Sequence, residues 1–246
     1  MKIAVFSDVH SNLAALEAVL ADIERRQIID LLNLGDSLSG PFSPRETADR
    51  LLGLDIPAVA GNHDRLLVET PRTEMGLWET WAADELEPRH LDWLASWPKT
   101  FERDGVLFCH ATPGDDAENW LDRRGPEQRL VMRDLEEVRG RLDSTSAEVI
   151  VCGHTHTPRV VRIPDGPLVV NVGSVGCPAY LDTRVEPNFI HQTGAPDARY
   201  AVIEKRNGIW AAELIAVPYD ASEMARLARR RGADSFARAV ETGWLS

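Results

Sequence analysis

The sequence predicts an α/β fold in a single domain that spans residues 1–246. Apolar strand-like runs alternate with amphipathic helical segments early in the chain, as is typical of parallel βαβ units. Each run ends in a cluster of polar residues, and open α/β sheets bind ligands at such strand ends. A chain of 246 residues is long enough for one large core, and no change in composition marks a domain boundary.

The first elements follow from hydrophobic periodicity. Residues 2–7 (KIAVFS) are predicted to form a strand, and residues 12–26 a helix. The apolar side chains of that helix repeat at the spacing of one helical face: Leu13, Leu16, Val19, Leu20 and Ile23. Residues 30–35 (DLLNLG) predict a second strand, residues 44–54 a helix, and residues 57–61 (PAVAG) a third strand.

Residues 71–98 are predicted to form a tryptophan-rich helical cap inserted after these elements. Trp78 and Trp81 are three residues apart, and Trp93 and Trp97 are four apart, so each pair shares a helix face. Two interpretations remain open: the indoles pack against the body of the protein, or they stack on a ring of the substrate. Packing is favoured, because buried aromatic residues mostly supply apolar area.

The second half of the chain is predicted to be rich in strands. Three apolar runs end at polar or glycine-containing turns: GVLFCH, AEVIVCGH and PLVVNVGS. Residues 199–217 predict a hairpin that turns at Asn207 and Gly208. A C-terminal tail, residues 219–244, is predicted to be helical from Ser222 onward.

Composition restricts the function classes. The formal net charge of −12 opposes binding to nucleic-acid backbones or anionic membranes, so neither is an expected partner. The three cysteines show no C-x-x-C spacing, which argues against a disulfide framework or a thiolate zinc site. No apolar run is long enough to span a bilayer, and the first residues resemble no secretory signal, so the expected location is the cytoplasm. The oligomeric state stays open.

Five strand ends carry residues of metal-ligand type. They are Asp8-Val9-His10, Gly35-Asp36, Gly61-Asn62-His63-Asp64, His110 and Gly153-His154-Thr155-His156. The H-x-H pair alone is a weak signal that two solvated imidazoles would explain equally well. Five such clusters in one α/β chain would need five coincidences, so a metal site is strongly favoured. Mixed carboxylate, imidazole and amide ligands suit borderline divalent ions, with manganese expected and iron, zinc, nickel or cobalt as alternatives.

The order D-x-H, G-D, G-N-H-D, H, G-H-x-H resembles the calcineurin-like metallophosphoesterase superfamily, in particular its small bacterial phosphodiesterase-like members. The resemblance extends from Asp8 to about Ser174. It implies a two-sheet β-sandwich flanked by helices, holding two metals about 3.5 Å apart. By position, the resemblance assigns Asp8, His10 and His156 to the first metal, Asn62, His110 and His154 to the second, and Asp36 to both.

The resemblance also implies a mechanism of phosphoester hydrolysis. A hydroxide bridging the two metals would attack phosphorus, and the local positive charge would offset the acidic protein. His63 would be the general acid that protonates the leaving oxygen. Asp64 is the second candidate catalytic residue, as the sequence neighbour of His63, although adjacency does not require contact.

The sequence departs from the family pattern at several positions. In the Ser/Thr protein phosphatases, an aspartate and an arginine stand at the places of Ser39 and Gly40, which argues against that activity. Ala179 occupies a position that is often basic, and Ala111 one that is often glycine. A phosphate contact would then come from elsewhere, and three arginines are candidates: Arg65, Arg159 and Arg184.

The favoured function is hydrolysis of phosphodiesters or nucleotides, with a small phosphate ester as substrate. A phosphomonoesterase and a dinucleoside-polyphosphate hydrolase are the enzymatic alternatives. A scaffold subunit of the retromer sorting complex resembles the same fold without clear turnover, but it lacks histidine at the position of His63, so the histidine here favours catalysis. Nuclease activity is disfavoured by the acidic charge.

Overall fold

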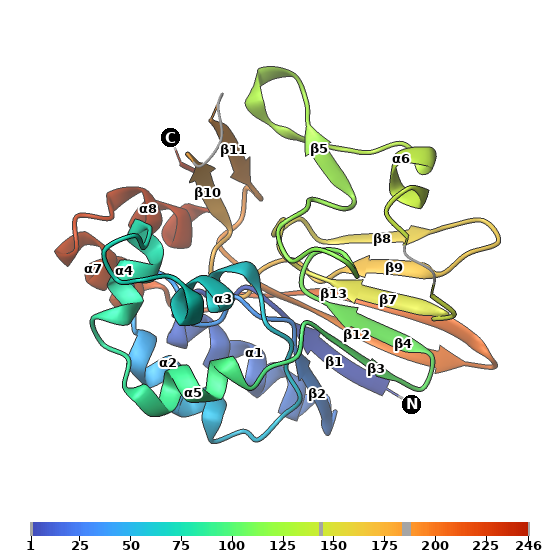
Figure 1. Cartoon of the computed structure of the whole chain (residues 1–246), viewed down its shortest axis with the longest axis horizontal. Helices are drawn as coiled ribbons and strands as arrows, with labels where there is room; N and C mark the ends of the chain where they lie inside the picture. The colour runs from blue at the N-terminus through green and yellow to red at the C-terminus, as the bar shows by residue number, and fades with distance from the viewer. Residues whose placement is uncertain (1, 143–144, 184–187, 246) are drawn as a thin grey trace.

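The computed structural model describes residues 2–142, 145–183 and 188–245, and it is built around two mixed β-sheets (Figure 1). The first sheet has the order β13–β12–β1–β2, in which β1 and β2 are parallel and the hairpin β12–β13 is antiparallel. Its strands are β1 (Lys2–Phe6), β2 (Asp30–Asn33), β12 (Ala198–Arg206) and β13 (Ile209–Val217).

The second sheet has the order β3–β4–β7–β9–β8, with β4, β7 and β9 parallel and the two edge strands antiparallel. Its strands are β3 (Thr100–Arg103), β4 (Val106–Cys109), β7 (Val149–Cys152), β8 (Arg159–Arg162) and β9 (Leu168–Asn171). Two small hairpins project from this framework: β5 (Asp122–Arg124) with β6 (Leu130–Met132), joined through the 3₁₀ turn η1 (Pro126–Gln128), and β10 (Ala179–Asp182) with β11 (Phe189–Gln192).

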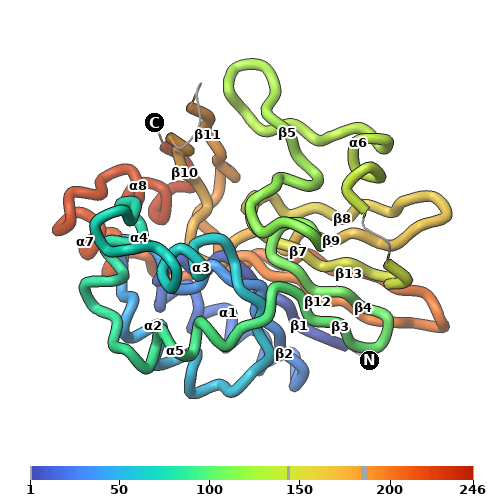
Figure 2. The backbone as a smooth tube through the Cα atoms, in the orientation of Figure 1, coloured from blue at the N-terminus to red at the C-terminus, as the bar shows by residue number. Residues whose placement is uncertain are grey.

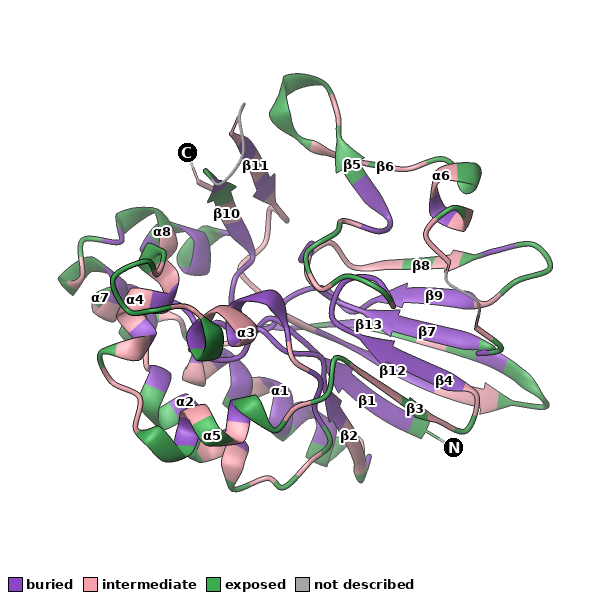
Figure 3. Cartoon of the chain, in the orientation of Figure 1, coloured by how far each residue is buried: buried purple, intermediate pink, exposed green. Residues whose placement is uncertain are grey.

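The main core lies between the two sheets, because alternate side chains of each strand point to opposite faces. Ile3 and Val5 of β1 pack into this layer with Phe108 of β4 and Val151 of β7. Each is fully buried, which stabilises the fold by about 1.5–3 kcal/mol per side chain. The buried central strands form the purple band of Figure 3. The predicted two-sheet sandwich flanked by helices is therefore confirmed.

Several helices cover the outer face of the first sheet, and one short helix lies against the second. Figure 2 shows the path of the chain as a tube. Against the first sheet, Leu16, Val19 and Ile23 of helix α1 pack on Ala4 and Phe6, the residues of β1 that face away from the sandwich. The helices on this side are α1 (Leu13–Arg25), α2 (Pro44–Leu52), α7 (Ser222–Arg230) and α8 (Asp234–Thr242). A short helix, α6 (Leu135–Arg139), packs beside the second sheet.

The predicted cap consists of two helices, α4 (Leu77–Ala83) and α5 (Pro88–Ala95), which follow α3 (Asn62–Glu69). Its tryptophans divide between the two interpretations. Trp93 and Trp97 are half-buried against the core and contact each other edge to face, with ring centroids 4.6 Å apart. Trp81 packs on Phe236 of α8, whereas Trp78 faces the cavity described below.

Two details of the expected fold needed correction. Residues 57–61 form no strand: Ala58 makes a single parallel bridge to Asn33, because the chain turns into α3 directly afterwards. The C-terminal tail divides into α7 and α8 at Gly232, which has a φ of 70°. The hairpin turn at Asn207 and Gly208 is as predicted, with φ values of 50° and 80°. Among the residues described, no helix is long and apolar enough to cross a bilayer.

Candidate metal centre

Parallel strands bring the candidate ligands to one edge of the sandwich. Asp8 follows β1 and Asp36 follows β2, and these strands are parallel neighbours. His110 and the His154 loop follow β4 and β7, which are parallel neighbours in the second sheet. Because the carboxyl ends of parallel strands meet at the same edge, both sheets deliver their polar loops to one place.

The loops form two clusters of potential ligand atoms. Asp8, His10 and His156 make the first, and Asp36, His110 and His154 make the second, with the ligand atoms of each within 4.8 Å of one another. In the first, Nε2 of His156 lies 3.2 Å from Oδ1 of Asp8 and 3.2 Å from Nε2 of His10. In the second, Nε2 of His110 lies 3.1 Å from Oδ2 of Asp36.

The two clusters adjoin each other. Nε2 of His110 is 4.0 Å from Oδ1 of Asp8, a contact between residues of different clusters. The Asn62 amide joins the second cluster, because one of its terminal atoms lies 3.0 Å from Nδ1 of His154. All seven residues predicted as metal ligands are thus brought together around one locus, and all except His154 are buried.

Three of the histidines use Nδ1 in a hydrogen bond to the surrounding protein and leave Nε2 facing the ligand clusters. Nδ1 of His110 donates to the carbonyl oxygen of Leu34 at 2.7 Å. Nδ1 of His156 donates in the same way to Cys177 at 2.7 Å, and His10 uses its Nδ1 on Ser39. Such outer hydrogen bonds fix the tautomer that presents a lone pair on Nε2 to a metal.

This donor set fits divalent cations. Two Nε2 atoms, of His10 and His156, face each other at 3.2 Å, and two lone pairs at that distance repel unless a cation or a proton lies between them. Oδ1 of Asp8 is fully buried and has no hydrogen-bond partner, which is costly for an ionised oxygen without a compensating charge. Imidazole nitrogens with carboxylate oxygens are the ligands that borderline divalent metals prefer.

The backbone of the ligand loops is strained. Left-handed φ values between 47° and 66° occur at Asp8, His10, Asp36, His154 and His156. A non-glycine residue in this region costs on the order of 1 kcal/mol or more, and such residues concentrate at functional sites. The strain at five of the seven expected ligands therefore supports a functional rather than a structural origin for these loops.

Glycines in the motifs allow close approach between loops. A Cβ at Gly153 would lie 2.6 Å from Oδ2 of Asp8, and one at Gly61 would lie 2.6 Å from the backbone nitrogen of Asp36. Both distances are far below van der Waals contact, so only glycine lets the neighbouring aspartate stay in place.

The electrostatics keep the two aspartates ionised. Burial raises the pKa of Asp8, but the neighbouring His156 and His110 outweigh it and lower that pKa to about 2. Asp36 has a pKa well below its ordinary value, because His110 and His63 overcome the effect of burial. Burial lowers the pKa of His110, yet the neighbouring Asp36 raises it to about 10.

His63 lies at the same locus, but its partner is not its sequence neighbour. The Nδ1 atom of His63 pairs with Oε1 of Glu79, a buried carboxylate of the cap helix α4. Trp78 stacks on the His63 ring at a centroid distance of 5.1 Å and an interplanar angle of 19°. Sequence reasoning missed Glu79, since a glutamate after Trp78 in a predicted helix carries no motif.

Asp64 serves the backbone. Its carboxylate accepts hydrogen bonds from the amides of Asp36 at 2.6 Å, Ser37 at 3.1 Å and Gly61 at 3.0 Å. Burial and the charge of Asp36 raise the pKa of Asp64 to about 7. These contacts tie the G-D loop to the G-N-H-D loop, so Asp64 holds Asp36 in position.

Residues 171–178 (NVGSVGCP) also support the ligand loops. The Asn171 amide donates to the carbonyl oxygen of Gly153 at 2.5 Å and to the hydroxyl of Thr155 at 3.1 Å. The Ser174 hydroxyl donates to the carbonyl oxygen of Asp8 at 2.8 Å. The segment therefore braces both the D-x-H and the G-H-x-H loops.

A cavity of about 420 Å³ opens from the clusters and His63 toward the cap. The apolar part of its lining consists of aromatic and aliphatic side chains: Leu66, Leu77, Trp78, Tyr180 and Leu181. Four carboxylates also line the cavity: Asp36, Glu74, Glu79 and Asp182. No lysine or arginine is among the described residues that line it.

The arginines proposed to contact phosphate are otherwise engaged. Arg65 donates twice to Asp116, at 2.6 and 2.9 Å. Arg159 is bound to the buried Asp122, with Nε 2.9 Å from Oδ1. Arg184 lies outside the described residues.

A two-sheet sandwich that gathers carboxylates, histidines and an amide at the ends of parallel strands defines a metal-dependent phosphoesterase fold. The family model of the calcineurin-like phosphoesterase superfamily domain matches residues 1–189, and the chain belongs to this superfamily. The resemblance stated from the motifs is therefore confirmed.

Two solved structures share the fold over nearly the whole chain. A metallophosphoesterase from Sphaerobacter thermophilus has a TM-score of 0.73 and 24% identity, covering 99% of each chain. The hypothetical protein PH1004 from Pyrococcus horikoshii OT3 has a TM-score of 0.75 and 15% identity, covering 99% of this chain and 98% of that one. In sequence, the chain is 28% identical over 233 residues to the uncharacterized protein MJ0912 of Methanocaldococcus jannaschii, which covers 89% of this chain and 88% of the relative.

Proposed function

We propose that this protein is a dinuclear-metal-dependent phosphoesterase that hydrolyses phosphodiesters or nucleotides, with His63 as the general acid. The observation that carries the proposal is the convergence of two ligand clusters and His63 on one cavity. Superfamily membership supports the hydrolase class, and the finer substrate assignment rests on the cavity itself.

The seven predicted ligands would hold the two ions. Asp8, His10 and His156 would bind the first, and Asn62, His110 and His154 the second, with Asp36 placed to serve both. When bound, two divalent ions would stabilise charge on the phosphoryl oxygens and activate water for attack. Manganese stays our predicted metal, and the cytoplasm our predicted location.

In this proposal, side chains of the protein protonate the leaving group. His63 is held at Nδ1 by Glu79 and against one ring face by Trp78, so its Nε2 is the nitrogen left to deliver a proton. A buried carboxylate at Nδ1 fixes the ring orientation and pairs with the ring once it is protonated. Glu79 is therefore a positioning residue in this proposal, and Asp64 is reassigned from catalysis to support of Asp36.

The walls of the cavity favour a phosphodiester with an uncharged organic group. Its aromatic and aliphatic lining can cover a nucleoside or an aryl group, and none of the described residues that line it is a lysine or arginine that could bind additional phosphates. This argues against a dinucleoside polyphosphate, whose chain of phosphates requires cations. Phosphomonoester hydrolysis remains the alternative, because the metal clusters would serve either ester.

The position of His63 as a general acid argues against the alternative of a non-catalytic scaffold protein. A pure scaffold has no use for a histidine that is paired with a buried carboxylate and turned toward two ligand clusters. Substitution of His63 by alanine should abolish turnover of esters with poor leaving groups while metal content stays unchanged.

The test is a comparison of bis(p-nitrophenyl) phosphate with p-nitrophenyl phosphate. The protein is stripped of metal by a chelator and then supplied in turn with Mn²⁺, Fe²⁺, Zn²⁺, Ni²⁺ and Co²⁺. The proposal predicts recovery of hydrolysis with at least one ion and a higher kcat/KM for the diester. Absence of hydrolysis with every ion would refute the enzymatic proposal, and a preference for the monoester would transfer the assignment to the alternative.

A further inference from the structure

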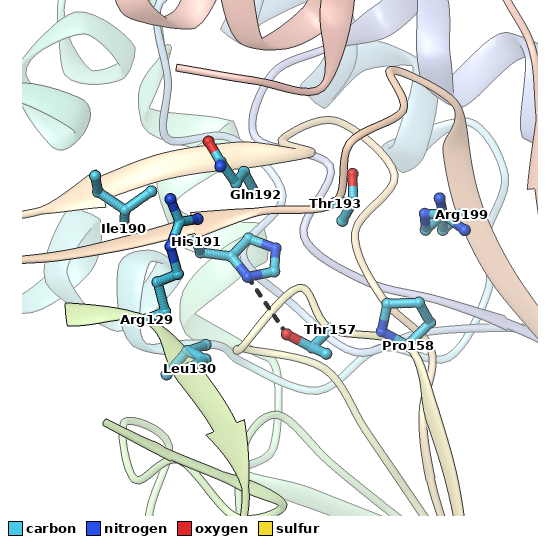
Figure 4. A pocket seen from close by; sticks show the side chains of 9 residues that line it. All are labelled: Arg129, Leu130, Thr157, Pro158, Ile190, His191, Gln192, Thr193 and Arg199. Carbon is cyan, nitrogen blue, oxygen red and sulfur yellow. Dashed lines mark hydrogen bonds between the residues drawn. The ribbon is translucent and has the colours of Figure 1, made fainter. Parts of the chain in front are cut away.

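A second cavity of about 350 Å³ is lined by Thr157 and Pro158, the residues that directly follow His156, and by His191 (Figure 4). The cavity lies between the β10–β11 hairpin, the β5–β6 hairpin, the loop after His156 and the start of β12. The ring of His191, from β11, faces the ring of His156 edge to face at a centroid distance of 5.9 Å. The two cavities share no lining residue in the described part of the chain.

Two arginines that pair with no carboxylate among the described residues line this cavity. Neither Arg129 nor Arg199 makes an ion pair or a side-chain hydrogen bond with any described residue, although most arginines of this protein pair with carboxylates. Nε of Arg199 is buried without a partner. No acidic residue is among the described side chains that line the cavity. In a chain of net charge −12, this is a local positive site suited to an anion.

The buried His191 adds an acceptor to the same space. Its side chain belongs to a residue only 5% exposed, and its Nδ1 lies 3.3 Å from Oγ1 of Thr157. That hydroxyl donates its single hydrogen to the carbonyl oxygen of Thr155 at 3.2 Å, so it accepts from Nδ1–H of His191. The other nitrogen, Nε2, is left with a lone pair and no partner, and it points away from Thr157 (Figure 4).

We propose that this cavity binds a phosphate group that carries a proton. Its anionic oxygens would face the guanidinium groups of Arg129 and Arg199, and its P–OH would donate to Nε2 of His191. Hydrogen phosphate supplies both functions, whereas sulfate has no proton to donate at neutral pH. The proposal does not depend on turnover at the metal centre. The group could belong to free phosphate or to a nucleotide.

Calorimetric titration of the metal-loaded protein with inorganic phosphate tests the proposal. Arg129→Gln removes one cation from an exposed position. Arg123→Gln, in the same β5–β6 hairpin but outside the cavity, is the matched control. We expect a binding component in the wild type and in Arg123→Gln that weakens at least about tenfold in Arg129→Gln, as the loss of a charge-assisted hydrogen bond predicts. Identical titrations of the wild type and Arg129→Gln would overturn the proposal.

Two further titrations identify the chemical class of the ligand. The component that depends on Arg129 should persist when equimolar sulfate is present, and its displacement by sulfate with equal affinity would overturn the role of His191 as acceptor. Titration with adenosine monophosphate separates the two sources: a tighter component sensitive to Arg129→Gln indicates a nucleotide, and a component seen with inorganic phosphate alone indicates free phosphate. Since no arm measures hydrolysis, failure of the proposed phosphoesterase activity would leave this result interpretable.

Discussion

Replacing Glu79 by glutamine should slow hydrolysis of substrates with poor leaving groups and spare those with good ones. The carboxylate is buried, at 4% exposure, and pairs with Nδ1 of His63. Burial raises the pKa of Glu79, but the hydrogen bond and charge of His63 outweigh it, so the net effect is a lowered pKa and an ionised carboxylate. Glutamine keeps the size of the side chain and removes the charge.

The magnitude follows from the hydrogen bond that is lost. A hydrogen bond to a charged group contributes about 1.5–3 kcal/mol, which corresponds to roughly a 10- to 150-fold decrease in kcat/KM if the bond acts in the transition state. An alkyl phosphodiester needs protonation of its leaving oxygen and should show the full decrease. A p-nitrophenyl ester leaves readily without a proton, so its rate should change by less than about threefold.

The assay compares these two esters over a range of pH for wild type, Glu79→Gln, His63→Ala and the double variant. Asp84→Asn is the matched control, because Asp84 ends the same helix and is exposed. The double variant should be no slower than His63→Ala alone, since Glu79 acts only through His63. Equal losses on both esters, or additive losses in the double variant, would refute the positioning role.

Three further outcomes are expected. Gly61→Ala should lose metal and at least about 100-fold of activity, because its Cβ would lie 2.6 Å from the backbone nitrogen of Asp36. Gly53→Ala is the control and should change neither metal content nor activity. Metal analysis of both variants checks this, and full metal occupancy in Gly61→Ala would contradict it. A metal at about 100 times its dissociation constant should add about 2.7 kcal/mol of stability, or roughly 5–10 °C in thermal midpoint, and an unchanged midpoint after chelation would argue against a site in the folded state. The hydroxyl of Tyr200, 2.6 Å from Asp22, helps to lower the pKa of that carboxyl against the effect of burial. Stability from Asp22 is therefore complete above the unfolded pKa near 4 and is lost as pH falls below it, so Tyr200→Phe should flatten the acid limb of denaturant titrations, and an unchanged limb would exclude this contribution.

The metal ligands could be predicted from the sequence because each lies in a short local motif at the end of an apolar strand. Asp8 and His10 are two residues apart, and His154 and His156 repeat that spacing, so local geometry carries the signal. The backbone at these four residues is left-handed, a conformation that the sequence alone does not indicate.

The rest depends on tertiary contacts that have no local signature. Glu79 reaches His63 because the cap folds over the strand ends, and nothing in residues 71–98 indicates that contact. The antiparallel insertion of β12 beside β1 is equally non-local, joining residues about 200 positions apart. Residues 57–61 look like a strand because they are apolar, but Ala58 alone pairs with β2 before α3 begins.

The central claim is that two cations bind side by side at the ends of the strands. Anomalous diffraction from crystals of the manganese-loaded protein tests it most directly. Two peaks are predicted, one among Asp8, His10 and His156 and the other among Asp36, His110 and His154. Crystals that contain manganese but show no peak at either cluster would contradict the account.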